Sequence, residues 1–124
     1  MPSIAIIGAS NDSGKYGHAA VLAFLQAGWV VHPVNPKEQE VAGLKAYASI
    51  VDVPQPVDWV SLYVPPTVGE SLLPGLAQVD ASEVWFNPGS ATSELLRGAQ
   101  EQLTAKVVSG CTIRAIGMDP KDYF

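Results

Sequence analysis

The chain has 124 residues, the size of one ordinary domain, and 48% of them are hydrophobic while 15% are charged. This composition supplies a packed core and excludes intrinsic disorder. Seven Lys and Arg against twelve Asp and Glu give a formal net charge of −5, which argues against a nucleic-acid partner, because such binding depends on basic side chains neutralising phosphates.

Two further features bear on location. No apolar run approaches the roughly 20 residues needed to cross a bilayer, and no basic segment with an apolar core opens the chain, so we expect no membrane contact and no signal peptide. The one cysteine, Cys111, has no internal partner for a disulfide. We therefore expect a reducing, cytoplasmic setting.

The first elements form a strand, a loop and a helix. Residues 3–7 are a short apolar run typical of a strand buried on both faces, and Gly8 ends it. Residues 16–27 have apolar side chains at three- and four-residue spacing, which predicts a helix with one buried stripe. Gly28 stands where a left-handed helix end belongs.

The middle of the chain is interrupted by proline. Residues 29–34 predict a second strand, which Asn35-Pro36 stops, and 44–47 predict a short third strand after a polar loop. Residues 49–56 hold at most one helical turn, because Pro54 and Pro56 block its continuation.

The second half repeats the alternation. We expect strands over 59–64, 84–87 and 106–109. One helix is predicted over 68–79, with Thr67 as its N-cap and Pro74 inside it, and another from the N-cap Thr92 to Leu103. The tail over 111–124 has no periodicity and is expected to be irregular.

This alternation predicts an α/β fold: a Rossmann-like, doubly wound parallel sheet in three layers, forming a single domain over residues 1–124. The expected strand order is 3-2-1-4-5, with a sixth strand beyond the fifth. A ligand crevice is then expected at the carboxyl ends of strands 1 and 4, where the order reverses. Loops rich in Gly, Pro, Ser and Asn follow strands 1, 2, 4 and 5 at that edge, and their convergence is the main functional indication.

The loop after the first strand suits a phosphate. Gly8 lets the backbone approach an anion closely, Ser10 offers a hydrogen-bond donor, and Lys15 adds a charge. The start of the following helix attracts anions through its free N–H groups. The alternative is that any strand-to-helix turn favours glycine and serine.

Named nucleotide fingerprints do not fit this loop. The Rossmann pattern needs a glycine where Ser10 stands, and the P-loop needs a short hydroxyl where Tyr16 follows Lys15. The second strand is followed by no carboxylate until Glu38, although NAD enzymes use one there. Lys37 instead favours a ribose that carries a phosphate, as in coenzyme A or NADP, unless it is simply a solvated surface lysine.

Several of these segments together resemble a known family. In chain order they are Gly8-Ala9-Ser10, Val34-Asn35-Pro36-Lys37, Gly43-Leu44-Lys45-Ala46-Tyr47 and Tyr63-Val64-Pro65-Pro66. They resemble the small stand-alone CoA-binding domain proteins, which are similar to the CoA-binding domain of the succinyl-CoA synthetase α subunit and of related acyl-CoA ligases.

The resemblance implies a coenzyme A or acyl-CoA ligand and a set of residues around it. The pyrophosphate would lie on the first loop, at Gly8, Ala9, Ser10 and Lys15. The ribose 3′-phosphate would lie near Asn35, Pro36 and Lys37. The groove for adenine or the pantetheine arm would be lined by Tyr63, Val64, Pro65 and Pro66.

Two departures limit what is carried over. The loop Asn87-Pro88-Gly89-Ser90 is more polar than the family suggests, which puts contacts there in doubt. The ligase relatives also use a phosphorylated histidine and an ATP-binding part, and neither His18 nor His32 matches that histidine. We therefore expect a binding module with no catalytic residues and no metal site.

The sequence alone leaves other functions open. An NADP-dependent oxidoreductase or an NAD(P)-binding regulatory domain would need a proton donor, for which Tyr63 and His32 are poor candidates. A purely structural subunit would use the loops only as turns, and a homodimer is not decided by the sequence. If Cys111 faces the pantetheine end, it would be able to form a mixed disulfide with CoA.

Overall fold

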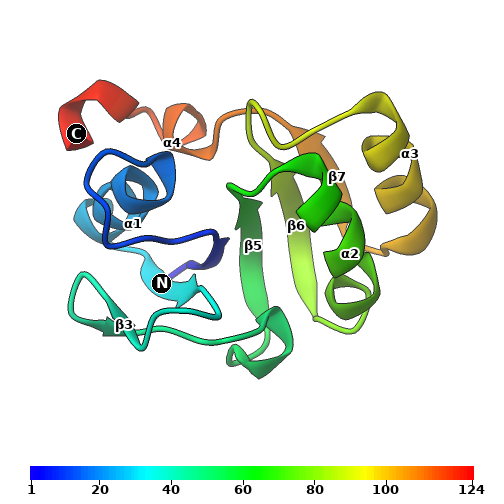
Figure 1. Ribbon diagram of the computed structural model, residues 1–124, viewed down its shortest axis with the longest axis horizontal. Coiled ribbons are helices and arrows are strands. Elements are labelled where there is room, and N and C mark those ends of the chain that lie inside the picture. The colour runs from blue at the N-terminus through cyan, green and yellow to red at the C-terminus, as the bar shows by residue number, and fades with distance from the viewer.

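The computed structural model describes residues 1–124 and contains a five-stranded, all-parallel sheet (Figure 1). Across the sheet the strands are β2 (Val30–Val34), β1 (Ser3–Ile7), β5 (Val57–Leu62), β6 (Ala81–Phe86) and β7 (Lys106–Ser109). Helices lie on both faces of the sheet, so the predicted α/β, Rossmann-like, single-domain fold is confirmed.

The central strand β1 is buried on both faces, as its continuous apolar sequence predicts. Ile4 and Ile6 belong to the core on one face, whereas Ala5 and Ile7 belong to the core on the other. All four side chains are 0–5% exposed. Alternate residues of a strand point to opposite faces, so this one short run contributes to two cores.

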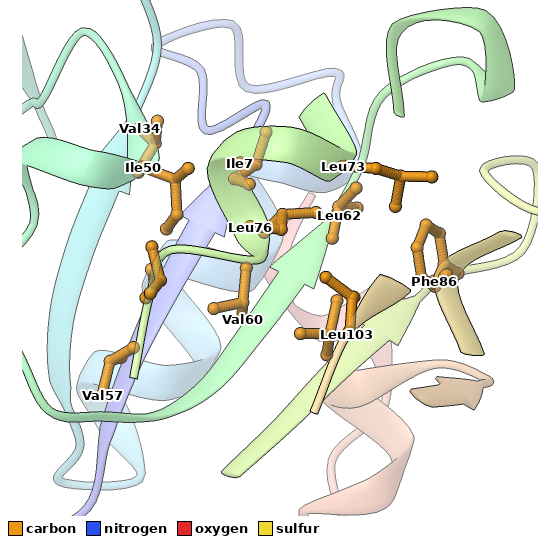
Figure 2. Close-up of a cluster of buried hydrophobic side chains, with 14 of the residues drawn as sticks. Ile7, Val34, Ile50, Val57, Val60, Leu62, Leu73, Leu76, Phe86 and Leu103 are labelled. Carbon is orange, nitrogen blue, oxygen red and sulfur yellow. The ribbon is translucent and has the colours of Figure 1, made fainter. Parts of the chain in front are cut away.

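Three helices form the outer layers. Helix α1 (Tyr16–Gln26) packs on the Ile4 and Ile6 face, while α2 (Pro66–Leu76) and α3 (Ser93–Gln102) cover the opposite face (Figure 1). On that second face Leu73 and Leu76 of α2 belong to the same core cluster as Leu62 of β5 (Figure 2). The predicted N-cap Thr92 accepts a hydrogen bond from the Leu95 N–H at 3.1 Å and starts α3.

The predicted third strand is wrong. Residues 44–47 do not join the sheet: β4 (Leu44–Lys45) pairs antiparallel with β3 (Glu40–Val41), and only Tyr47 makes a single parallel bridge to Val34. The turn between β3 and β4 consists of Ala42 and Gly43 with φ of 52° and 79°, the left-handed pair typical of a tight hairpin. The observed sheet order therefore corresponds to predicted strands 2-1-4-5-6.

Two other boundaries differ from the sequence prediction. Helix α2 begins at Pro66 with Pro65 as its N-cap, so Thr67 lies inside the first turn, and it ends at Leu76, two residues after Pro74. Proline is favoured at the first helical position because its missing N–H would have no partner there.

The prediction of an irregular tail over 111–124 is wrong, because this segment is ordered. It forms the short helix α4 (Thr112–Ala115) and the 3-10 turn η2 (Pro120–Tyr123), whose N-cap Asp119 accepts a hydrogen bond from the Lys121 N–H. These elements are too short to show a hydrophobic period. The tail returns from β7 to pack against α1 (Figure 1). None of the helices is both long enough and apolar enough to cross a membrane.

Candidate ligand-binding cleft

A cleft of about 660 Å³ opens at the carboxyl ends of the strands. It lies where the sheet order reverses between β1 and β5, because Gly8 follows β1 and Tyr63 follows β5. Its volume is within the range of about 300–1,000 Å³ that small-molecule sites occupy. Its lining residues are Gly8, Gly14, Lys15, Tyr16, Gly17, Tyr63, Val64, Pro65, Asn87, Pro88, Gly89, Ser90, Cys111, Arg114 and Pro120.

Two glycines let the walls of the cleft approach each other. Gly8 has φ of +90°, and a Cβ there would lie 2.8 Å from the Tyr63 carbonyl oxygen. A Cβ on Gly17 would collide with the carbonyl oxygen of Gly8. Since only glycine fits at either position, the first turn of α1 rests directly on the end of β1.

Two backbone N–H groups at the start of α1 are free of hydrogen bonds within the chain. The Tyr16 and Gly17 N–H groups donate no hydrogen bond within the chain. The preceding amides are engaged, since the Gly14 N–H binds Asp12 Oδ1 at 2.9 Å and the Lys15 N–H binds the Asp12 carbonyl at 3.1 Å. The N–H groups that this helix end leaves available to a ligand are therefore those of Tyr16 and Gly17.

The charge of the cleft is opposite to that of the chain. Lys15 and Arg114 line it, and none of its lining residues is Asp or Glu, although the chain carries twelve of these acids. Two cations beside unpaired N–H groups, in a concave site without carboxylates, favour a ligand with negative charge.

A network of hydrogen-bonded polar side chains lies at the base of the cleft, and its members Tyr63 and Asn87 line it. Asn87 is 1% exposed, and its Nδ2 donates to Ser61 Oγ and to the Leu62 carbonyl, both at 2.8 Å. Its Oδ1 accepts from the Thr112 N–H at 3.0 Å. Thr112 Oγ1 lies 2.8 Å from the Tyr63 hydroxyl. The network ties β5, β6 and α4 together and leaves its side-chain polar atoms satisfied within the protein.

Tyr63 stays protonated throughout the physiological range. Burial raises the pKa of its hydroxyl to about 12, and the nearby Cys111 thiol adds to the rise, while hydrogen bonds with Thr112 and Ser61 oppose it. A phenol with this pKa is a poor proton donor or base at neutral pH.

The structure brings five of the predicted site residues together in the cleft: Gly8, Lys15, Tyr63, Val64 and Pro65. Two others on the first loop, Ala9 and Ser10, do not line it. Ala9 is fully buried, and Ser10 Oγ accepts a hydrogen bond from the Asp12 N–H at 3.0 Å. Both residues shape the loop from within.

The predicted residues after β2 also lie outside the cleft. Asn35 joins the two loops, since its Nδ2 donates to the Ala9 carbonyl and its Oδ1 accepts from the Lys37 N–H, each at 2.8 Å. Pro36 is exposed, and Lys37 lines a separate polar depression with Glu38, Gln39, Glu40 and Lys45. Pro66 lines a third groove, between α2 and α3.

Sequence reasoning missed part of the lining. The sequence predicts the edge of the sheet at which the loop from Asn87 to Ser90 lies, but the polarity of this loop departs from the family pattern and does not indicate a site. Arg114 and Pro120 lie in a tail with no recognisable pattern, so nothing in the sequence points to them. Tyr16 enters the sequence argument only as a residue that does not fit a P-loop.

Comparison with known proteins now decides the family. The profile of the family described as "CoA binding domain" matches residues 2–116. The chain belongs to this family. The resemblance found in its loops is therefore confirmed over nearly the whole sequence.

Two relatives of this CoA binding domain differ in length. The ADP-forming acetate–CoA ligase II of Archaeoglobus fulgidus is 37% identical over 118 residues, which cover 93% of this chain and 18% of the ligase. The "Uncharacterized protein YneT" of Bacillus subtilis is 28% identical over 112 residues, which cover 87% of this chain and 80% of that protein. The chain spans only 10–18% of the first three ligases that it matches.

Solved structures agree with the fold. A conserved hypothetical protein from Pyrococcus furiosus has a TM-score of 0.85 and 31% identity, over 93% of this chain and 99% of its own. The dinucleotide-forming acetyl-coenzyme A synthetase 1 of Ca. Korarchaeum cryptofilum has a TM-score of 0.74 and 28% identity, over 85% of this chain but only 25% of its own. The same domain is thus found both in small proteins and inside much larger ones.

Proposed function

We propose that this protein binds coenzyme A, or an acyl-CoA, in the cleft and performs no catalysis of its own. One observation carries the proposal: the free Tyr16 and Gly17 N–H groups and Lys15 all line one cleft, and no carboxylate lines it. These groups would hold the diphosphate of the ligand. The family supports the ligand class, because it is a CoA binding domain family.

The shape of the cleft fits the rest of such a ligand. Val64 and Pro65 provide an apolar wall beside Tyr63, where the adenine or the pantetheine arm would pack. Loop residues Asn35, Pro36 and Lys37 lie outside the cleft and would meet the ribose 3′-phosphate where the ligand extends beyond it. Gly8 and Gly17 permit the close backbone contact between the end of β1 and the start of α1, because a Cβ on Gly8 would meet the Tyr63 carbonyl and one on Gly17 would meet the Gly8 carbonyl. This contact holds the free N–H groups beside the cleft.

The contacts of the cleft residues support a binding role rather than a catalytic one. The polar atoms of Asn87 and Thr112 are engaged with each other and with Ser61. The high pKa of Tyr63 disfavours it as the proton donor of an NADP-dependent oxidoreductase. His32, the other candidate, lies on β2 and does not line the cleft.

A thermal-shift series with CoA, NADP, NAD and ATP tests the proposal. A ligand present at about 100 times its Kd stabilises the native state by about 2.7 kcal/mol. We expect CoA to raise the melting temperature most and NAD least. Lys15→Gln should reduce the CoA shift, whereas Lys121→Gln, a change of an exposed lysine outside the cleft, should leave it unchanged. Equal shifts for all four nucleotides, or none, would reject CoA as the ligand.

A further inference from the structure

The cleft contains a second cation from a part of the chain far from the glycine loop. Arg114 lies on α4, and with Lys15 at the start of α1 it accounts for all the charge that lines the cleft. A guanidinium presents five N–H donors in a planar fork that can bind phosphate oxygens in pairs, whereas Lys15 contributes a point charge. The two cations therefore suit different parts of one multiply charged group.

Arg114 is only weakly engaged within the protein. Its Nη2 lies 3.9 Å from Asp119 Oδ1, and the two side chains are 62% and 47% exposed. An ion pair this long and this exposed contributes little to the stability of the fold. Asp119 Oδ1 also accepts the Lys121 N–H at 3.0 Å, so the carboxylate has a structural partner without Arg114. The guanidinium can exchange Asp119 for a ligand at little cost.

The backbone that carries Arg114 is, by contrast, firmly fixed. Thr112, two residues before it, is fully buried, and its N–H donates to Asn87 Oδ1 at 3.0 Å. Thr112 Oγ1 also lies 2.9 Å from Ser61 Oγ and 2.8 Å from the Tyr63 hydroxyl. A fixed backbone reduces the conformational entropy that is lost when the side chain binds a ligand.

We propose that Arg114 is a second diphosphate-binding residue, held at the cleft by the hydrogen bonds between Thr112 and Asn87, and that it leaves Asp119 when the ligand binds. This proposal rests on the proposed function, and it identifies the recognised group as one with at least two negative charges. Asp119 then acts as a competitor for the guanidinium, and the Thr112–Asn87 contact acts as a positioning contact.

Calorimetric titration with CoA at low salt tests the role of Arg114 directly. We expect Arg114→Gln to weaken CoA binding about tenfold, and Arg114→Lys to weaken it less, since a lysine keeps the charge without the fork. Lys121→Gln is the matched control and should bind CoA as the unchanged protein does. Because Arg114 is exposed, Arg114→Gln should not change the melting temperature of the protein without ligand.

Asp119→Asn supplies a test with the opposite sign. The asparagine oxygen can still accept the Lys121 N–H, but the competing charge is gone, so CoA should bind about two- to threefold more tightly. A residue with a purely structural role would not tighten binding when altered. In the Arg114→Gln background the same change should have a smaller effect, because the guanidinium is no longer there to be released.

Thr112→Val tests how firmly Thr112 is held, because it removes the hydrogen bonds of the hydroxyl to Ser61, Tyr63 and Asn87 but keeps the N–H bond to Asn87. It should weaken CoA binding in the unchanged protein and have little further effect once Arg114 is glutamine, which separates positioning from general destabilisation. If CoA binds and Arg114→Gln binds it equally well, this inference is overturned and the proposed function survives. If CoA does not bind the unchanged protein at all, both are overturned.

Discussion

A Cβ atom on Gly17 would collide with the carbonyl oxygen of Gly8, so the first turn of α1 and the first residue after β1 are in direct backbone contact. This contact places the free Tyr16 and Gly17 N–H groups near the carboxyl ends of the paired strands β1 and β5. The close approach therefore stabilises the fold and also positions the N–H groups that we propose bind the diphosphate.

Gly17→Ala is expected to destabilise the protein by about 1–3 kcal/mol, because the added methyl group forces the helix away from the strand. The loss should be visible as a lower urea midpoint, together with weaker CoA binding. Gly98→Ala is the matched control in α3. Its Cβ would meet Leu73 Cδ1 at an ordinary 3.7 Å, and alanine favours helix, so stability should rise by up to about 1 kcal/mol.

Asn87→Ala should cost about 1–3 kcal/mol in the free energy of unfolding, because it leaves the buried Thr112 N–H without its acceptor. Asn11→Ala also removes side-chain hydrogen bonds, to Glu38 and to the Glu40 carbonyl, but at an exposed position where water replaces them. Denaturant unfolding compares the two. Similar small losses would show that the buried network contributes little.

The sequence predicted the sheet well where its patterns were long or unambiguous. The apolar run of β1, the amphipathic period of α1 and the N-cap Thr92 each determine their element locally. It failed at residues 44–47, where the left-handed Ala42-Gly43 turn folds the segment back on β3 instead of into the sheet. A preference for a hairpin cannot be separated from a preference for a sheet edge in so short a run.

The site was predictable only in part, for a related physical reason. The topology rule locates the loop of Gly8 and the loop of Tyr63 at one edge without any knowledge of side chains. Arg114 enters the cleft because Thr112 is anchored to Asn87, a contact between residues 25 positions apart in sequence. Nothing in the local sequence encodes that contact.

Lys37→Gln should weaken the binding of CoA more than that of dephospho-CoA, because we place the 3′-phosphate of the ribose near this lysine. The expected difference is a few-fold, since the side chain is exposed and its charge is screened. Lys106→Gln, on the edge strand β7, controls for the change in net charge. Calorimetric titration of both ligands against the three proteins provides the measurement. If Lys37→Gln weakens the binding of CoA and of dephospho-CoA equally, Lys37 does not contact the 3′-phosphate.

Cys111 should form a mixed disulfide when the protein is incubated with CoA disulfide, because it lines the cleft and carries no disulfide of its own. The Cys111 thiolate attacks one sulfur of the CoA disulfide, and one CoA thiolate leaves. Intact-protein mass spectrometry should show the addition of one CoA, reversed by a reductant and absent in Cys111→Ser. A protein that stays unmodified after prolonged incubation would place the thiol of the ligand elsewhere.

Tyr63 predicts a loss of stability at high pH. The folded state favours the neutral phenol and raises its pKa from 10.0 to about 12, so its contribution is complete below about pH 10 and is lost as the pH rises toward about 12. Tyr63→Phe should flatten the pH dependence of the unfolding free energy over this window. The slope is the relevant quantity, because the substitution also removes the hydrogen bond to Thr112.

The most direct test of the account is calorimetric titration of the protein with CoA and, separately, with pantetheine, which has the same arm but no diphosphate. We predict saturable binding of one CoA per chain, an affinity that falls as salt is added, and much weaker binding of pantetheine. Pantetheine binding as tight as CoA, or CoA binding that salt does not affect, would contradict the central claim that the start of α1 holds a diphosphate.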